Sequence, residues 1–189
     1  MTDLASFDPY AYPLEPWWFL RPGSLHGIGH TRRVLIHAAA LAPAAGLTPV
    51  EFQALVHAAA WHDIGRTHDG REPDHGRKSL ARVEDLNLAC DLSPEVLEPM
   101  AFAIEWHSTD DELGLQAATP AETPGATPDS KTRAAEAPTR DSRLRVLWAL
   151  KDADGLDRVR IYDLDVTRLR SAAARAREAE AWRLYEQMG

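Results

Sequence analysis

The stretch HAAAWHDIGRTHDG, residues 57–70, places His62 directly before Asp63 at the end of an alanine-rich segment. Adjacent residues on an α-helix point about 100° apart, because the helix has 3.6 residues per turn. Two neighbouring polar groups at the end of an apolar helix therefore either face solvent or are needed in the interior. The residues on either side of this stretch help to decide between these interpretations.

Length and composition describe an acidic globular chain. Its 189 residues can bury a sizeable core, and we expect a single domain over residues 1–189. The net charge of -8 argues against nucleic acid or an anionic membrane as a partner, since both attract basic surfaces. A single cysteine, Cys90, cannot form an internal disulfide. We see no export signal and no membrane-spanning run, and therefore expect a cytoplasmic protein.

Helical periodicity dominates the sequence and predicts an all-α protein. The best-defined helix start is at Pro49, because Thr48 precedes it and Glu51 completes a capping box. We predict helices over residues 24–42, 49–64, 74–88, 94–108, 142–158 and 163–187.

Two stretches lack that periodicity. Residues 1–23 hold several prolines and an aromatic cluster, and we expect an irregular segment packed by its aromatic rings. Residues 113–141 are rich in Ala, Thr, Pro and charged residues. Such a composition buries too little apolar surface to offset the entropy lost on ordering. We therefore predict a flexible insertion there, before the helix that carries the last candidate ligand.

Helical phase brings His and Asp residues onto the apolar faces of five predicted helices. Counting back in fours from Val34 on the first apolar stripe gives His30 and then His26. The stripe of the second helix reaches His62 and Asp63 together. The other three helices carry, in the same way, His75, His107 and Asp154.

Several such groups buried near one another are best explained by a shared cation, because an unpaired buried carboxylate is very unfavourable. Imidazole and carboxylate together suit one or two divalent ions of Mn, Fe, Co, Ni or Zn, without selecting among them. A histidine alone on an apolar face is more often a hydrogen-bonded core residue, and we interpret His37, His57 and His68 in this way. His26 is left open between that interpretation and a place beside the site.

The order of His30, His62-Asp63, His75, His107 and Asp154 resembles the HD-domain superfamily of metal-dependent phosphohydrolases. The local matches are HTRRV, WHDIGR, DHGRKS, IEWHS and KDADGLDR, which cover residues 26–157. The resemblance implies an all-α HD-domain helical bundle whose inner helices present the metal ligands.

The resemblance also implies roles for individual residues. The core metal ligands would be His30, His62, Asp63 and Asp154, with His75 and His107 as the extra ligands of members that bind two metals. Asp63 would bridge the two ions. Asp152 would at best orient a ligand histidine. Arg66 lies where the related HD-GYP proteins have a lysine, and we expect it to bind a substrate phosphate.

The predicted function is hydrolysis of a small phosphate ester, with a nucleotide as the first choice, by metal-activated water. Asp63 would take up or hand on the proton, and Arg66 would neutralise phosphoryl charge. Two alternatives stay open. Some HD proteins with the same six ligands resemble di-iron oxygenases, and a folded HD scaffold can also bind a nucleotide as a sensor without catalysis. The oligomeric state is not predicted.

Overall fold

The computed structural model describes residues 5–119 and 130–188. Within these ranges the chain forms eight α-helices and three short 3-10 helices and contains no strand, which confirms the all-α prediction. The α-helices are α1 (Ile28–Leu41), α2 (Pro49–Trp61), α3 (His75–Asp85), α4 (Pro94–Trp106), α5 (Asp111–Ala118), α6 (Ser130–Leu156), α7 (Ala172–Arg175) and α8 (Glu178–Met188). The 3-10 helices are η1 (Pro16–Trp18), η2 (Asp157–Ile161) and η3 (Val166–Arg168).

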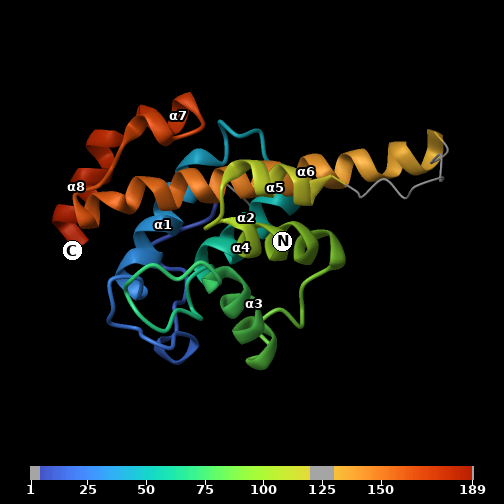
Figure 1. The fold of residues 1–189 in the computed structure, drawn as a ribbon. Coiled ribbons are helices and arrows are strands. Elements are labelled where there is room, and N and C mark those ends of the chain that lie inside the picture. Colours follow the sequence, from blue (N-terminus) through green and yellow to red (C-terminus); the bar gives the residue numbers. More distant parts are fainter. Residues whose placement is uncertain (1–4, 120–129, 189) are drawn as a thin grey trace.

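Helices α1, α2, α4 and α6 form the centre of a bundle. Helix α2 packs against the other three, and α6 packs against both α1 and α4. Helix α3 lies on α4, and α5 lies on α6. Helices α7 and α8 lie at the C-terminal end of α6, where α8 also contacts α1 and η2 (Figure 1).

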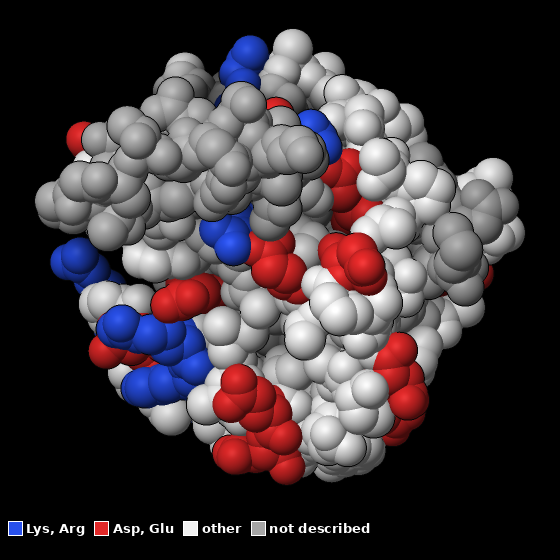
Figure 2. All heavy atoms as spheres, turned by 90° about the vertical axis from the view of Figure 1, so that its right-hand side faces the viewer, with Lys and Arg blue, Asp and Glu red and all other residues white. Residues whose placement is uncertain are grey.

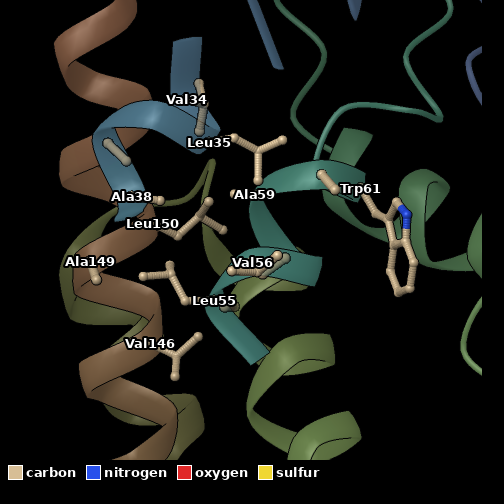
Figure 3. Packing of buried hydrophobic residues seen from close by; sticks show 14 of the residues in the cluster. Val34, Leu35, Ala38, Leu55, Val56, Ala59, Trp61, Val146, Ala149 and Leu150 are labelled. Carbon is tan, nitrogen blue, oxygen red and sulfur yellow. The ribbon is translucent and has the colours of Figure 1, made fainter. Parts of the chain in front are cut away.

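The core is built where α1, α2 and α6 meet (Figure 3). Leu35 from α1, Leu55 and Ala59 from α2 and Leu150 from α6 are fully buried there. Small residues such as Ala59 let the helix backbones approach closely, and larger neighbours fill the remaining space to the density typical of protein interiors. This packing fixes the ends of the central helices relative to one another.

The start of α2 confirms the predicted capping box. Thr48 Oγ1 accepts a hydrogen bond from the Glu51 backbone N–H, and Glu51 Oε2 accepts one from the Thr48 N–H at 2.8 Å. The Arg145 side chain also donates a hydrogen bond to the Glu51 carboxylate, with Nε of Arg145 3.0 Å from Oε1 of Glu51. Because Arg145 lies on α6, this contact holds the first turn of α2 against α6. It thereby helps to fix the direction in which α2 runs toward His62.

The N-terminal segment is largely irregular and packs through its aromatic rings, as predicted. Trp18 and Phe19 are buried in the core, whereas Trp17 is 57% exposed. Arg82 of α3 donates hydrogen bonds to the backbone carbonyls of Trp17 and Trp18. These bonds tie the segment to α3.

The structure differs from the predicted flexible insertion over residues 113–141. Its first residues belong to α5, and helix α6 already begins at Ser130. Residues 120–129 lie outside the described ranges, so the prediction of flexibility is not tested there. Gly114 packs closely against Leu147, and Ala118 is fully buried. Small residues therefore let α5 pack tightly with little apolar side-chain area, which composition alone did not reveal.

The predicted helix over residues 163–187 is wrong as a continuous element. It is divided into η3, α7 and α8. Side chains favour these breaks: Asp165 accepts from the Thr167 N–H, and Ser171 caps α7 by accepting from the Ala174 N–H. The buried Asp152 carboxylate accepts from the backbone N–H groups of Arg170 and Ser171, at 2.7 and 2.8 Å.

The surface carries mixed charges. On the face shown in Figure 2, the described Asp and Glu residues are spread widely, and Lys and Arg form no continuous basic surface. Among the helices of the described ranges, none is both long and apolar enough to cross a membrane.

Candidate metal centre

The predicted ligands lie at the ends of five helices. His62 and His107 occupy the C-cap positions of α2 and α4, and Asp154 lies in the last turn of α6. His75 is the first residue of α3, and His30 is in the first turn of α1. The carboxyl ends of α2, α4 and α6 carry partial negative charge, which favours a cation.

These helix ends bring the imidazole rings together in two pairs. Nε2 of His30 lies 3.1 Å from Nε2 of His62, and Nε2 of His75 lies 2.8 Å from Nε2 of His107. The Asp63 carboxylate lies near both pairs. Its Oδ1 is 3.2 Å from Nε2 of His75, and its Oδ2 is 3.5 Å from Nε2 of His30.

Asp154 completes the cluster and marks its open side. Its Oδ1 lies 3.4 Å from Nε2 of His30. The Asp154 side chain is 31% exposed, whereas that of Asp63 is 3% exposed. The structure therefore brings all six predicted ligands into one cluster. Three overlapping sets could hold an ion: His26, His30 and Asp63; His30, His62 and Asp154; and His62, Asp63 and His107.

The four ligand rings all place Nδ1 against an oxygen atom. Nδ1 of His62, His75 and His107 lies 2.9, 2.6 and 2.7 Å from the backbone carbonyl oxygen three residues earlier. Nδ1 of His30 lies 2.7 Å from Oδ2 of Asp157. A carbonyl or carboxylate oxygen only accepts, so Nδ1 holds a proton in His30, His62 and His107. In His75 the same nitrogen also faces Nη1 of Arg66, a donor, at 2.9 Å. In the neutral rings of His62 and His107, Nε2 then directs a lone pair into the cluster.

This donor set fits a divalent transition metal. When His30 is neutral, its Nε2 lone pair and that of His62 lie 3.1 Å apart and repel each other, and a shared cation removes this repulsion. Asp63 Oδ1 is buried and has no hydrogen-bond partner among the described residues. Both features are expected of coordinating atoms, and mixed imidazole and carboxylate ligands suit first-row divalent ions.

The electrostatics of the cluster favour the protonation states that coordinate a metal. Burial opposes ionisation of Asp63, but His62 and the histidines hydrogen-bonded to Asp63 hold its pKa well below the usual range. Burial lowers the pKa of His62 to about 3 and that of His75 to about 4. Near neutral pH the rings of His62 and His75 are therefore neutral and lie beside a carboxylate anion, which are the ligand forms of these groups.

His30 behaves differently from these rings. Burial and the charge of Arg160 lower its pKa, but the hydrogen bonds to Asp157 and Asp63 prevail and raise it. The two carboxylates thus favour a protonated His30 in the metal-free protein. A metal would have to displace that proton, which makes metal binding at His30 dependent on pH.

His26 belongs to the cluster. Its Nδ1 lies 2.9 Å from Oδ2 of Asp63, and its side chain is 14% exposed. In the sequence, the position of His26 one turn before His30 had left its role open between a core residue and a place beside the site. Arg160 lies beside it, with Nη2 3.2 Å from Nδ1 of His26. Sequence reasoning missed Arg160, because η2 has no periodic pattern that would place it.

The two remaining predicted polar residues lie elsewhere. Arg66 is buried, with Nη1 2.9 Å from Nδ1 of His75 and Nη2 donating to the Gly70 carbonyl at 2.7 Å. It lies behind the ligand ring, so its predicted contact with a substrate phosphate stays a prediction. Asp152 does not orient a ligand histidine, since its carboxylate binds the backbone before α7. Asp157 contacts His30 instead.

Comparison with known families agrees with this arrangement. The family model of the HD domain matches residues 27–159, which is most of the chain and includes all six ligands. The protein therefore belongs to the HD-domain family, within the superfamily of metal-dependent phosphohydrolases. Searches among curated proteins and among solved structures return no match.

Proposed function

We propose that this protein is a metal-dependent hydrolase of small phosphate esters, with nucleotides as the substrate class to test first. One observation carries the proposal: four imidazole Nε2 atoms and two carboxylates converge, and one of them, Asp154, is open to solvent. A closed structural metal site has no need of an exposed ligand, whereas a catalytic site needs an open position.

The residues on the open side suggest how the chain itself contributes. A bound divalent ion would lower the pKa of water and polarise a phosphoryl oxygen. His26 donates from Nδ1 to Asp63, which leaves its Nε2 to exchange a proton with substrate or solvent. The Asp63 carboxylate would keep this ring in one tautomer and orientation.

Two arginines are candidates to neutralise phosphate charge. Arg160 lies beside His26, and its charge acts on Asp154 at the open side. Arg66 lies on the other side of the cluster, behind His75. We place the stronger phosphate contact on Arg160 and keep the predicted contact of Arg66 as the alternative. The variants Arg160→Gln and Arg66→Gln separate them, because loss of the phosphate contact raises KM or lowers kcat in one variant only.

The decisive experiment is a hydrolysis screen. The purified chain is loaded with Mn²⁺, Fe²⁺, Co²⁺, Ni²⁺ or Zn²⁺ and incubated with nucleoside mono-, di- and triphosphates and with phosphate esters that lack a base. We expect metal-dependent release of phosphate that is lost in His62→Gln and kept in His37→Gln. His37 is the matched control, because it is buried on α1 outside the cluster.

The same protein samples test the alternatives. Metal binding without hydrolysis of any ester would contradict the proposal. Oxygen consumption by the iron-loaded protein would then support the oxygenase. Nucleotide binding without turnover would support the sensor. Hydrolysis only of esters that lack a base would keep the hydrolase but exclude the nucleotide class.

A further inference from the structure

His30 differs from the other ligand histidines in the partner of its Nδ1. The other three rings contact a backbone carbonyl three residues earlier. For His30 that carbonyl belongs to Gly27, and it accepts the Thr31 N–H of the first turn of α1. The partner of His30 is instead the Asp157 side chain, which is 127 residues away in the sequence.

Asp157 is held in place on several sides. It is fully buried, and Arg33 donates two hydrogen bonds to its carboxylate. Nε of Arg33 lies 2.5 Å from Oδ1, and Nη2 lies 3.1 Å from Oδ2. Arg160 donates to the Asp157 backbone carbonyl at 3.0 Å. A buried carboxylate persists as an anion only with such compensation. The arrangement keeps Asp157 charged and leaves it little freedom to turn away from His30.

Arg33 links this contact to the C-terminal part of the chain. Its guanidinium lies over the ring of Tyr185 on α8, 5.5 Å from the ring centre. Arg33 of α1 therefore contacts both Asp157 of η2 and Tyr185 of α8, and these three elements also pack against one another. The order of contacts is Tyr185, Arg33, Asp157 and His30.

We propose that Asp157 is a positioning residue of the metal centre: held by Arg33, it keeps the proton of His30 on Nδ1 and directs the Nε2 lone pair at the metal. The inference depends on the metal site of the proposed function and is independent of the substrate. Carboxylates that orient a ligand histidine in this way typically change metal affinity by about 10- to 100-fold when they are altered.

The first test measures metal affinity. Co²⁺ and Zn²⁺ are titrated into wild type and Asp157→Asn in competition with a coloured chelator. We expect affinity to fall by about 10- to 100-fold in Asp157→Asn. Asp152→Asn is the matched control, since Asp152 is equally buried beside the same helix end but contacts backbone N–H groups. It should lower the melting temperature and leave metal affinity unchanged. Equal affinities of wild type and Asp157→Asn would overturn the proposal.

The second test needs no bound metal and no activity. The ¹⁵N chemical shifts of the histidine rings report the tautomer, with His30 identified by its loss in His30→Gln. In the metal-free wild type at a pH where His30 is neutral, we expect the proton on Nδ1. In Asp157→Asn we expect a mixture of the two tautomers. A wild-type His30 with its proton on Nε2 would overturn the proposal even if Asp157→Asn failed to fold.

The two tests separate this inference from the proposed function. Weaker metal binding in Asp157→Asn without hydrolysis of any ester supports the role of Asp157 and contradicts the hydrolase. Hydrolysis by a wild type whose His30 carries the proton on Nε2 supports the hydrolase and contradicts the role of Asp157. If wild type bound none of the ions, both the metal-dependent function and the role of Asp157 at a metal centre would be overturned.

Discussion

Two buried histidines of α1 show what separates a ligand from a core residue. His30 and His37 are seven residues apart, lie on the same side of the helix and are almost completely buried. Nδ1 of His30 is hydrogen-bonded to Asp157, and its Nε2 lies among the polar side chains of the cluster. Neither ring nitrogen of His37 has a hydrogen-bond partner among the described residues. Burial and helical phase are therefore shared, and only the neighbours differ.

The difference follows from the position of each residue along its helix. His30 is in the first turn of α1, where the ends of α2 and α6 bring other polar side chains. His37 is in the middle of α1, where neighbouring helices present mainly apolar side chains. Charged groups act on it from Arg33, Arg177 and Asp157, without a hydrogen bond. A histidine at a helix end thus lies among other polar side chains, whereas a histidine in the middle of a helix has no hydrogen-bond partner nearby.

The largest effect is expected at the centre of the cluster. Asp63→Asn replaces a carboxylate that lies near both histidine pairs. A metal contributes several kcal/mol to such a reaction, so we expect the rate to fall by about 10³-fold or more. His37→Leu in the same assay should keep the wild-type rate. If both variants lost activity equally, the functional contrast between cluster and core would be wrong.

A smaller effect is expected on the pH dependence of stability, and it concerns His37. Burial lowers the pKa of His37 from its usual 6.5 to about 4. The unfolded chain binds a proton as the pH falls through 6.5, while the folded chain resists until about pH 4. Stability should therefore be full above pH 6.5 and fall by about 3 kcal/mol down to pH 4 on account of this residue.

His37→Leu tests this expectation. Urea unfolding at pH 7 and pH 4.5 gives the free energy of unfolding of wild type and variant. The variant should lose clearly less stability on acidification, because it has no ring to protonate in the unfolded chain. Equal losses in the two proteins would show that His37 has a usual pKa and that its isolation has no energetic effect.

Metal removal should have a slightly smaller effect on stability. An ion that binds only the folded chain stabilises it by about 2.7 kcal/mol at a hundred times its dissociation constant. For a chain of this size, we expect chelation to lower the melting temperature by about 5 to 10 °C. His37→Leu should show the same decrease, and His62→Gln should show almost none. A decrease of equal size in all three proteins would contradict the assignment of the metal to the cluster.

The sequence predicted which His and Asp residues face the interior, because they follow helical phase. His62, Asp63, His107 and Asp154 continue apolar stripes to helix ends, and the resemblance to HD domains supplied the fold that brings them together. Asp157 lies within the helix predicted over residues 142–158, three residues after Asp154, and Arg160 lies beyond that helix. What the sequence did not show is their contacts with His30 and His26, which join distant segments. Short 3-10 helices and long-range hydrogen bonds depend on the finished packing, so they could not be predicted.

For the helices as well, the sequence predicted local features and missed those that depend on long-range contacts. The capping box of α2 is local, and the structure confirms it. The breaks after α6 depend on Asp152 reaching the backbone of Arg170 and Ser171, 18 and 19 residues later. Helix propensity of the Ala, Arg and Glu residues could not reveal that contact. Composition likewise missed α5, whose packing relies on the small residue Gly114 against Leu147.

The smallest effect is expected at His57, a partly buried histidine that lies between the two extremes. Burial lowers its pKa to about 4, as for His37, but its Nδ1 lies 3.1 Å from the Tyr12 hydroxyl and its ring stacks on Trp61. Tyr12→Phe would remove this hydrogen bond and make the His57 ring more similar to that of His37. We expect the free energy of unfolding to fall by about 1 kcal/mol, the usual net value of such a hydrogen bond.

Tyr10→Phe is the matched control for that change, because Tyr10 is 59% exposed and an exposed hydroxyl contributes little. Urea unfolding at pH 7 measures both variants, and the difference between them isolates the contact with His57. A loss of about 1 kcal/mol in Tyr12→Phe alone means that a single partner is enough to stabilise a partly buried ring. Equal stability of the two variants would mean that a ring without partners, such as His37, is tolerated by this core without cost. In that case the convergence of several helix ends, and not the presence of one partner, is the feature that distinguishes the metal ligands.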